Sequence, residues 1–317
     1  MFDFIMNPIN QLFGWIINFC YLLTNSYGLA IILFTLVTKV ILLPFAIKQQ
    51  KNTVKNAVFQ PKVQEIQKKY ANDRQRMSEE MAKLQQEGYS PMGGCLPLLV
   101  QFPIIIGLYN VIRNPLTYIS RLSADAVSKI LEVIQNNGGL GSLKISDYGA
   151  QIRIANAIPS YMDKLTAALP DVFSNFINVD LHFLGLNLGL TPEVGRFSAL
   201  WIIPLLSGGT AFLVGYITQR LQAAAANQDN SQTQKAGMAM LLTMPLMSLF
   251  FTFTMPAGVG LYWITSNVLT IGQSYALNHF MNPKDYVEKV KREAETRKAR
   301  RRELIRQYEQ KMREEKD

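Results

Sequence analysis

Hydrophobic residues in this chain are gathered into five blocks of about 20 residues, and charged residues collect between the blocks. A nearly charge-free run of that length is what an α-helix needs to cross the hydrocarbon core of a bilayer. The blocks cover 27–47, 93–112, 197–218, 237–254 and 257–279. The pattern predicts an all-α membrane protein with five transmembrane helices, although the mean hydropathy of the whole chain is only +0.07.

The N-terminal segment, 1–26, is apolar but interrupted by polar residues. We predict an amphipathic helix that lies in the outer membrane interface, with a sixth span as the alternative. The interruptions fall at Asn7, Pro8, Asn10, Gln11 and Asn18. No Lys or Arg precedes Lys39, so the basic start of a secretion signal is missing.

Basic residues are concentrated in two connecting segments. Segment 48–92 holds nine Lys or Arg against five acids, and 280–317 holds thirteen against nine, whereas 113–196 holds seven of each. Because positive loops stay in the cytoplasm, five spans place the N-terminus outside and the C-terminus in the cytoplasm. The segment 113–196 is then an outer loop and 219–236 a short cytoplasmic loop.

The basic segment 48–92 has apolar residues at helical spacing on both sides of a turn signal. Asn72 and Asp73 form that signal, and Gly88 marks the end of a second helix. We predict a cytoplasmic helical hairpin, which is either a solvated connector or a mobile arm that touches a partner. The apolar stripe is Val54, Val58, Val63, Ile66, Tyr70, Met77, Met81 and Leu84.

The outer segment 113–196 predicts a small helical cap. Two helical stretches, near 122–136 and 149–169, are separated by the sequence NNGGLGS. The apolar stretch 180–190 is too short to span and predicts an interfacial segment, in which His182 is structural rather than a ligand.

Lys39 is the only charge in the first block. A lysine near the middle of a span costs roughly 2.5–3.5 kcal/mol. The next charge, Lys48, lies nine residues away, about 13.5 Å of helix, which is too far for the lysine stem to reach the surface comfortably. We therefore predict that the Lys39 ammonium faces a wet cavity lined by protein.

Other polar residues inside the blocks indicate where that cavity lies. Gln101 is expected at the depth of Lys39, Gln273 slightly nearer the cytoplasm and Asn267 slightly further out. An interhelical hydrogen bond is the alternative for Gln101. The predicted hydrophilic groove is lined by Lys39, Thr35, Thr38, Gln101, Asn267 and Gln273.

The C-terminal segment predicts a polar helix from Pro283 with a cluster of basic residues. Such a cluster can bind anionic lipid or the phosphates of ribosomal RNA; a solvated tail that only fixes topology is the third interpretation. The cluster is Arg297, Lys298, Arg300, Arg301, Arg302 and Arg306.

The sequence gives no sign of an enzyme. The two cysteines, Cys20 and Cys95, make no disulfide framework, and His182 and His279 lie far apart without metal-ligand spacing. We expect no cofactor, metal or small-molecule substrate.

Several longer motifs resemble one known family. They are LLPFAIKQQKN (42–52), FQPKVQEIQKKY (59–70), GGCLPLLVQFPIIIGLYNVI (93–112) and MPLMSLFFTFTMPAGVGLYWITSN (244–267). Together they resemble the YidC-type membrane protein insertases of the Gram-positive kind. The resemblance implies a five-span core whose hydrophilic groove opens to the cytoplasm and to lipid and is closed on the outer side.

The resemblance also implies roles for two residues. A basic residue of the first span, here Lys39, contacts client segments, and the aromatic of the last-span LYW motif corresponds to Trp263, for which interfacial anchoring is the alternative. Relatives usually carry arginine at the position of Lys39 and proline at that of Arg74. A groove glutamine of the third span has no match in 212–218, and the outer loop is longer than usual.

The implied function is insertion and folding of integral membrane proteins, alone or with the Sec translocon. Partners are then nascent membrane proteins, the lipid bilayer and, through the basic tail, the ribosome. A transporter with Lys39 as counter-ion is the rival interpretation; the five blocks show no inverted repeat and contain no carboxylate. A membrane scaffold is a third.

Overall fold

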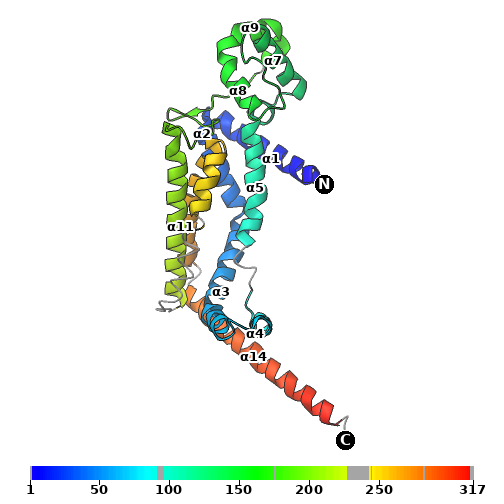
Figure 1. Ribbon diagram of the computed structural model, residues 1–317, viewed down its shortest axis with the longest axis vertical. Helices are drawn as coiled ribbons and strands as arrows, with labels where there is room; N and C mark the ends of the chain where they lie inside the picture. Colours follow the sequence, from blue (N-terminus) through cyan, green and yellow to red (C-terminus); the bar gives the residue numbers. More distant parts are fainter. Residues whose placement is uncertain are drawn as a thin grey trace. The chain divides into compact units, whose positions relative to one another are not determined.

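The structure is a computed structural model that describes residues 2–90, 96–174, 176–226, 243, 245–280 and 283–314, and the described elements are almost all helical (Figure 1). The chain divides into two compact units. Unit 1 comprises Met1–Ile41, Val100–Val214 and Leu242–Thr270, and unit 2 comprises Leu42–Leu99, Gly215–Leu241 and Ile271–Asp317. Cys95, most of the predicted loop 219–236 and the start of block 237–254 lie outside the described residues.

Helix α1 (Phe2–Thr24) is apolar on two faces. One face is buried in unit 1 and includes Ile17 and Tyr21, whereas Trp15, Phe19 and Leu23 are exposed. An exposed apolar face beside a packed one suits a helix in the membrane interface, and the interfacial location stays a prediction.

The first predicted span is interrupted. Helix α2 (Tyr27–Ile41) ends before Leu42, and α3 (Leu43–Lys69) begins with Pro44 in its first turn. Proline has no N–H and its ring clashes with the carbonyl four residues earlier, here Val40, so it favours the start of a new helix over the continuation of the old one. Pro44 in the sequence LLPFAI was a signal for this break, but the continuous apolar run predicted one helix over 27–47.

The other predicted spans contain helices with somewhat different bounds. They are α5 (Leu96–Arg113), α11 (Ile202–Ala226), the helix Pro245–Thr254 and α13 (Ala257–Phe280). Within the described residues, one helix, Ala199–Leu221, is by itself long and apolar enough to cross a membrane, and α2 with α3 passes as a broken pair. A helical membrane protein fits these elements, and the count of five spans stays a prediction.

The outer segment forms the predicted helical cap of unit 1, in which α7 buries the apolar stripe Val127, Ile130, Leu131 and Ile134 (Figure 1). The stretch 180–190 contains a two-stranded antiparallel hairpin that pairs His182 with Asn187, and its interfacial location stays a prediction. The elements of segment 113–196 are α6 (Pro115–Tyr118), α7 (Ala124–Asn136), α8 (Ala150–Ala157), η2 (Ile158–Tyr161), α9 (Met162–Ala168), α10 (Pro170–Phe173), β1 (His182–Phe183) and β2 (Leu186–Asn187). A short 3₁₀ helix, η3 (Ala199–Trp201), precedes α11.

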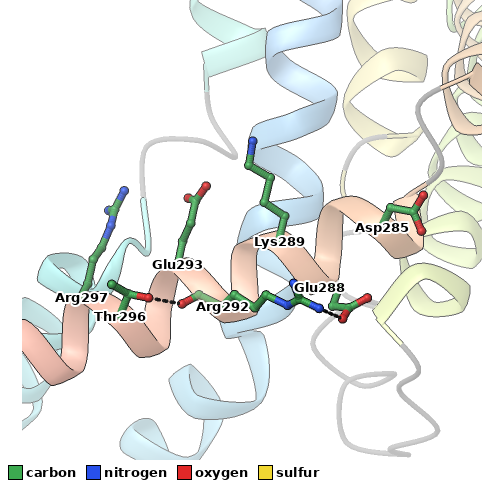
Figure 2. A pocket seen from close by; sticks show the side chains of 7 residues that line it. All are labelled: Asp285, Glu288, Lys289, Arg292, Glu293, Thr296 and Arg297. Carbon is green, nitrogen blue, oxygen red and sulfur yellow. Dashed lines mark hydrogen bonds and ion pairs between the residues drawn. The ribbon is translucent and has the colours of Figure 1, made fainter.

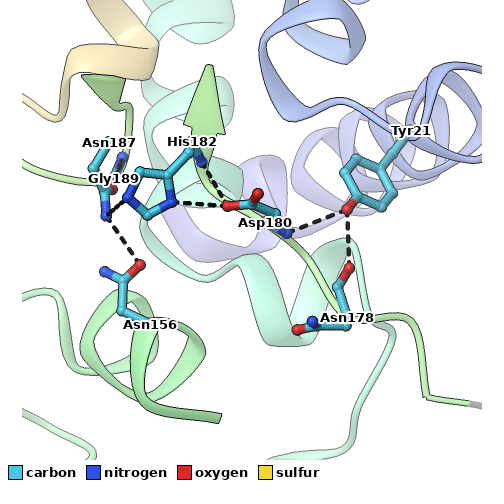
Figure 3. Close-up of polar contacts among 7 residues, drawn as sticks. All are labelled: Tyr21, Asn156, Asn178, Asp180, His182, Asn187 and Gly189. Carbon is cyan, nitrogen blue, oxygen red and sulfur yellow. Dashed lines mark hydrogen bonds and ion pairs between the residues drawn. The ribbon is translucent and has the colours of Figure 1, made fainter. Parts of the chain in front are cut away.

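Figure 3 shows the polar contacts that hold this hairpin. The backbone N–H of His182 donates to Asp180 Oδ1 (2.9 Å), and the His182 Nδ1 lies 2.8 Å from the same oxygen. The backbone donor, followed by the imidazole, lowers the pKa of Asp180 below its ordinary value. Tyr21 on α1 donates to the carbonyl of Asn178 (2.9 Å). These contacts assign His182 a structural role, as predicted.

Unit 2 contains the predicted helical hairpin. Helix α3 ends at Lys69, and α4 (Arg74–Glu87) begins after Asp73, whose side chain accepts from the N–H of Arg76 (3.0 Å). Gly88 ends α4 with φ of 122°, a conformation that favours glycine. Arg74 occupies the first helical position, where proline is also well tolerated. Because Asp73 caps the helix, arginine at this position leaves the cap intact.

The hairpin does not present its apolar stripe to solvent, because α14 (Pro283–Glu314) packs on it. Phe59, Val63, Leu84 and Val290 form the buried core of unit 2, with Tyr286 and Ala294 against it. The sequence predicted a connector or a mobile arm, and neither interpretation included the C-terminal helix. The structure shows a three-helix core built from segments more than 200 residues apart in the sequence.

Candidate functional site

Lys39 lies in the last turn of α2, and its Nζ donates a hydrogen bond to Oγ1 of Thr270 on α13 (2.8 Å). The Thr270 hydroxyl donates in turn to the carbonyl of Ser266 (2.7 Å), which leaves its lone pair for the ammonium. A cation in the last turn of a helix is also stabilised by the unsatisfied carbonyls there. Within the part of the chain that the structure describes, no carboxylate forms an ion pair with Lys39. The charge is therefore held by neutral groups.

Two more helices of unit 1 make polar contacts with α13. Gln101 on α5 donates to the hydroxyl of Tyr262 (2.9 Å), and Asn267 donates to Oγ1 of Thr210 on α11 (3.0 Å). Tyr262 and Thr270 are eight residues apart, about 12 Å along the helix. The contacts of Gln101 and Lys39 are therefore spread along α13, whereas the sequence predicted one shared depth. We call the set Lys39, Gln101, Thr210, Tyr262, Asn267 and Thr270 the α13 polar seam.

The remaining predicted groove residues lie elsewhere or bond locally. Thr35 and Thr38 are buried, and their hydroxyls donate to the carbonyls of Ile31 (2.7 Å) and Thr35 (2.9 Å) in their own helix. Trp263 is partly buried and stacks on Phe251 at 6.1 Å between ring centroids. Gln273 belongs to unit 2. The structure thus brings together Lys39, Gln101 and Asn267 through α13.

Unit 1 is tightly packed at the end that carries the cap. The backbone N–H groups of Ala257 and Gly258, at the start of α13, donate to the carbonyls of Leu190 (2.8 Å) and Leu188 (2.7 Å). These two carbonyls satisfy donors that have no partner within the helix. Every residue from Ala257 to Tyr262 is buried.

Glycines permit this close packing. A Cβ on Gly260 would approach Ile203 Cγ2 to 2.3 Å, and one on Gly28 would overlap the ring of Phe183. Around them, Tyr27 and Ile112 are fully buried. We call this region, comprising 27–34, 108–112, 188–190 and 257–261, the cap end of unit 1.

The region around Lys39 is much more exposed. On α2, Val40 and Ile41 are 62% and 63% exposed, and Phe102 on α5 and Val268 on α13 are about half exposed, at 47% and 53%. Apolar side chains at this exposure in a helical membrane protein suit contact with lipid. We call this region, comprising 35–41, 101–102 and 268–270, the Lys39 end of unit 1. A charged group therefore lies beside exposed apolar surface at one end, while the residues named at the other end are buried.

Sequence reasoning missed Tyr262, Thr270 and Thr210. Threonine inside an apolar helix commonly bonds its own backbone, so its presence does not reveal a partner. Tyr262 stands in the LYW motif, which directed attention to Trp263. Small polar residues at helical spacing on α13, namely Ser266 and Thr270, were the available signal for a helix interface.

The predicted basic cluster lies on α14 in unit 2. Its members are exposed except Arg301, which is partly buried. The pKa of Glu80 on α4 is lowered, first by the hydrogen bond from Lys83 and also by the positive charge of Arg301. The proximal part of α14 has a shallow hollow, shown in Figure 2, where Glu288 accepts from Arg292 (2.6 Å). Its seven lining residues include three acids and three bases, so the hollow has no net charge that would select a ligand.

Comparison with known proteins identifies the family. The family model described as 60Kd inner membrane protein matches residues 19–285. A protein of Clostridium tetani named membrane protein insertase YidC is 30% identical over 78% of this chain and 80% of its own length. Proteins of that name from Fusobacterium nucleatum and Oceanobacillus iheyensis are 26% and 28% identical, each over 86% of this chain and over 96% and 82% of their own lengths. The resemblance found in the sequence motifs is confirmed, and the chain belongs to the 60Kd inner membrane protein family of YidC-type insertases.

Proposed function

We propose that this protein is a membrane protein insertase of a bacterial cell membrane, and that Lys39 supplies the positive charge that receives hydrophilic segments of its clients. The observation that carries the proposal is the environment of Lys39. Its ammonium is bonded to the neutral Thr270 hydroxyl, and none of the five predicted spans contains an acidic residue. The charge is therefore available to an acidic group on a client.

The asymmetry of unit 1 supports a groove that is closed outward and open inward. With the N-terminus outside, the cap end faces the exterior, where buried residues and the glycine contacts of α13 leave little room for water. The Lys39 end faces the cytoplasm and lipid. A wet half-channel of this kind shortens the dry path over which each unsatisfied backbone group costs several kcal/mol.

The mechanism needs no bond chemistry. An acidic segment next to a client's apolar span enters the groove and approaches Lys39, and the apolar span then moves sideways into lipid. Burial of the apolar span drives the overall step. A membrane potential that is positive outside assists each acidic charge by roughly 2.3 kcal/mol per 100 mV. Clients are nascent integral membrane proteins, taken up by the protein alone or beside the Sec translocon.

An insertion assay with an acidic-tailed, single-span client tests the role of Lys39. We expect Lys39→Arg to retain insertion, Lys39→Gln to reduce it and Lys39→Glu to abolish it, because glutamate repels the client's acids. Val40→Glu is the matched control, since Val40 is exposed on the same turn and lacks the Thr270 contact. Normal insertion by Lys39→Glu would refute the proposal.

Ion flux separates insertase from transporter. Liposomes that contain the purified protein should show no Lys39-dependent ion or proton flux if the groove handles polypeptide alone. A flux lost in Lys39→Gln would favour the transporter instead.

A further inference from the structure

Helix α14 has two halves with different surroundings. In the proximal half, Tyr286, Val290 and Ala294 pack on the hairpin core of unit 2. The same face, at the three- and four-residue spacing of a helix, then carries Arg297 and Arg301. It becomes apolar again at Leu304, Ile305 and Tyr308. Those last three side chains are 58%, 47% and 67% exposed. The helix therefore carries an apolar face beyond the part that its own unit covers.

Basic residues surround this exposed face. Residues 297–308 contain six Lys or Arg and one acid, Glu303. Lys298, Arg300, Arg302 and Arg306 are all exposed. Neighbouring copies of the same cationic helix would repel each other, which disfavours a second copy of this chain as the occupant.

We propose that the distal half of α14, residues 298–308, docks on the membrane surface through anionic lipid headgroups, with Leu304, Ile305 and Tyr308 inserted at the boundary of the acyl chains. A cationic helix with an apolar stripe is the form that binds at such an interface. RNA would complement the basic residues but would offer the apolar stripe no comparable partner.

The connection to the last predicted span makes this docking possible. Helix α14 begins three residues after α13 ends at Phe280, and its 32 residues extend about 48 Å. The docking needs a membrane-embedded chain and does not depend on the insertion of clients. Lys39→Gln should therefore leave it unchanged.

Fluorescence from two neighbouring positions tests the proposal on the full-length protein in vesicles. With Cys20 and Cys95 replaced by alanine, Tyr308→Cys and, separately, Gln310→Cys are labelled with the polarity-sensitive dye nitrobenzoxadiazole. Gln310 is the matched control because it is exposed and lies on the opposite side of the helix, about 160° away at 100° per residue.

We expect a blue-shifted emission and quenching by nitroxide-labelled lipid at position 308, and not at 310, in vesicles that contain phosphatidylglycerol. Purely phosphatidylcholine vesicles should give neither effect. Lys298 and Arg300 are exposed and each lie about 80° from Tyr308 around the helix. Changing either residue to Gln should lower the docked-to-undocked ratio about fivefold, whereas Lys298→Arg and Arg300→Lys should preserve it.

Three outcomes would overturn the proposal. One is the same emission at position 308 in both kinds of vesicle, and another is equal burial of 308 and 310. The third is protection of position 308 by poly(U) RNA in phosphatidylcholine vesicles without any effect of phosphatidylglycerol, which would make this face a nucleic-acid surface. A chain truncated after Ala299 keeps the packing of Val290 and serves as the control for folding.

Discussion

The cap end and the Lys39 end of unit 1 are built from the same helices but packed in opposite ways. At the cap end, α2, α5 and α13 meet through fully buried residues such as Tyr27 and Ile112, and glycines bring backbones together. At the Lys39 end the same helices expose apolar surface, and α2 and α5 make polar contacts with α13. The difference teaches that one bundle can combine a fully buried apolar end with an end where a charged side chain lies beside exposed apolar surface.

Placing an additional lysine at one end or the other should give the largest effect on the amount of folded protein in the membrane. Ile31 is fully buried at the cap end, so Ile31→Lys places an unpaired ammonium in a dry site and costs several kcal/mol. We expect little folded protein in the membrane. Val37→Lys, on the exposed side of α2, is the comparison and should accumulate to a higher level than Ile31→Lys, because its side chain is not enclosed by protein and can reach toward water or headgroups. Abundance and protease resistance in membranes measure both, and equal accumulation of the two variants would remove the distinction between the ends.

Glycine substitutions sharpen the comparison at a smaller scale. Gly260→Ala pushes a methyl group into Ile203, and such overpacking typically costs about 1–3 kcal/mol. Gly209 on α11 has nothing within 4 Å of its missing Cβ, so Gly209→Ala should be neutral or stabilise the helix by up to about 1 kcal/mol. Thermal unfolding in detergent distinguishes them. A Gly260→Ala protein as stable as the wild type would show that the cap end can relax.

The smallest effect is expected when the Thr270 hydroxyl, which accepts the hydrogen bond from Lys39, is removed. Thr270→Val removes the acceptor but keeps the charge, so insertion should fall by about tenfold, the effect of one hydrogen bond to a charged group at the low end of its range. Thr270→Ser is the control and should behave as the wild type. If Thr270→Val were as inactive as Lys39→Glu, the geometry of the hydrogen bond would matter more than the charge.

The sequence predicted the elements whose signals are local. The turn at Asp73 and the end at Gly88 follow from capping preferences of single residues, and the helical stretches of the cap follow from short-range periodicity. Lys39 was identified as a functional candidate because one charge in an apolar run is conspicuous. Each of these features depends on residues close together in the chain.

Features that depend on distant partners were missed or misplaced. Thr270 lies 231 residues from Lys39, and nothing in a threonine indicates which helix will meet it. The docking of Val290 on Phe59 and Val63 joins the thin apolar stripe of the hairpin to a C-terminal helix that the sequence predicted only as polar. The break at Leu42 was signalled by Pro44, but the apolar run on both sides outweighed it in the prediction.

Accessibility to water is the most direct test of the central claim that Lys39 lies in a groove open to the cytoplasm and closed to the exterior. In a protein whose Cys20 and Cys95 are replaced by alanine, Lys39→Cys and Ile31→Cys are treated with a membrane-impermeant maleimide, applied in turn to each side of oriented membrane vesicles. The account predicts rapid modification of position 39 from the cytoplasmic side alone and none of position 31 from either side. Protection of position 39 from the cytoplasmic reagent, or its modification from the outside, would contradict the account.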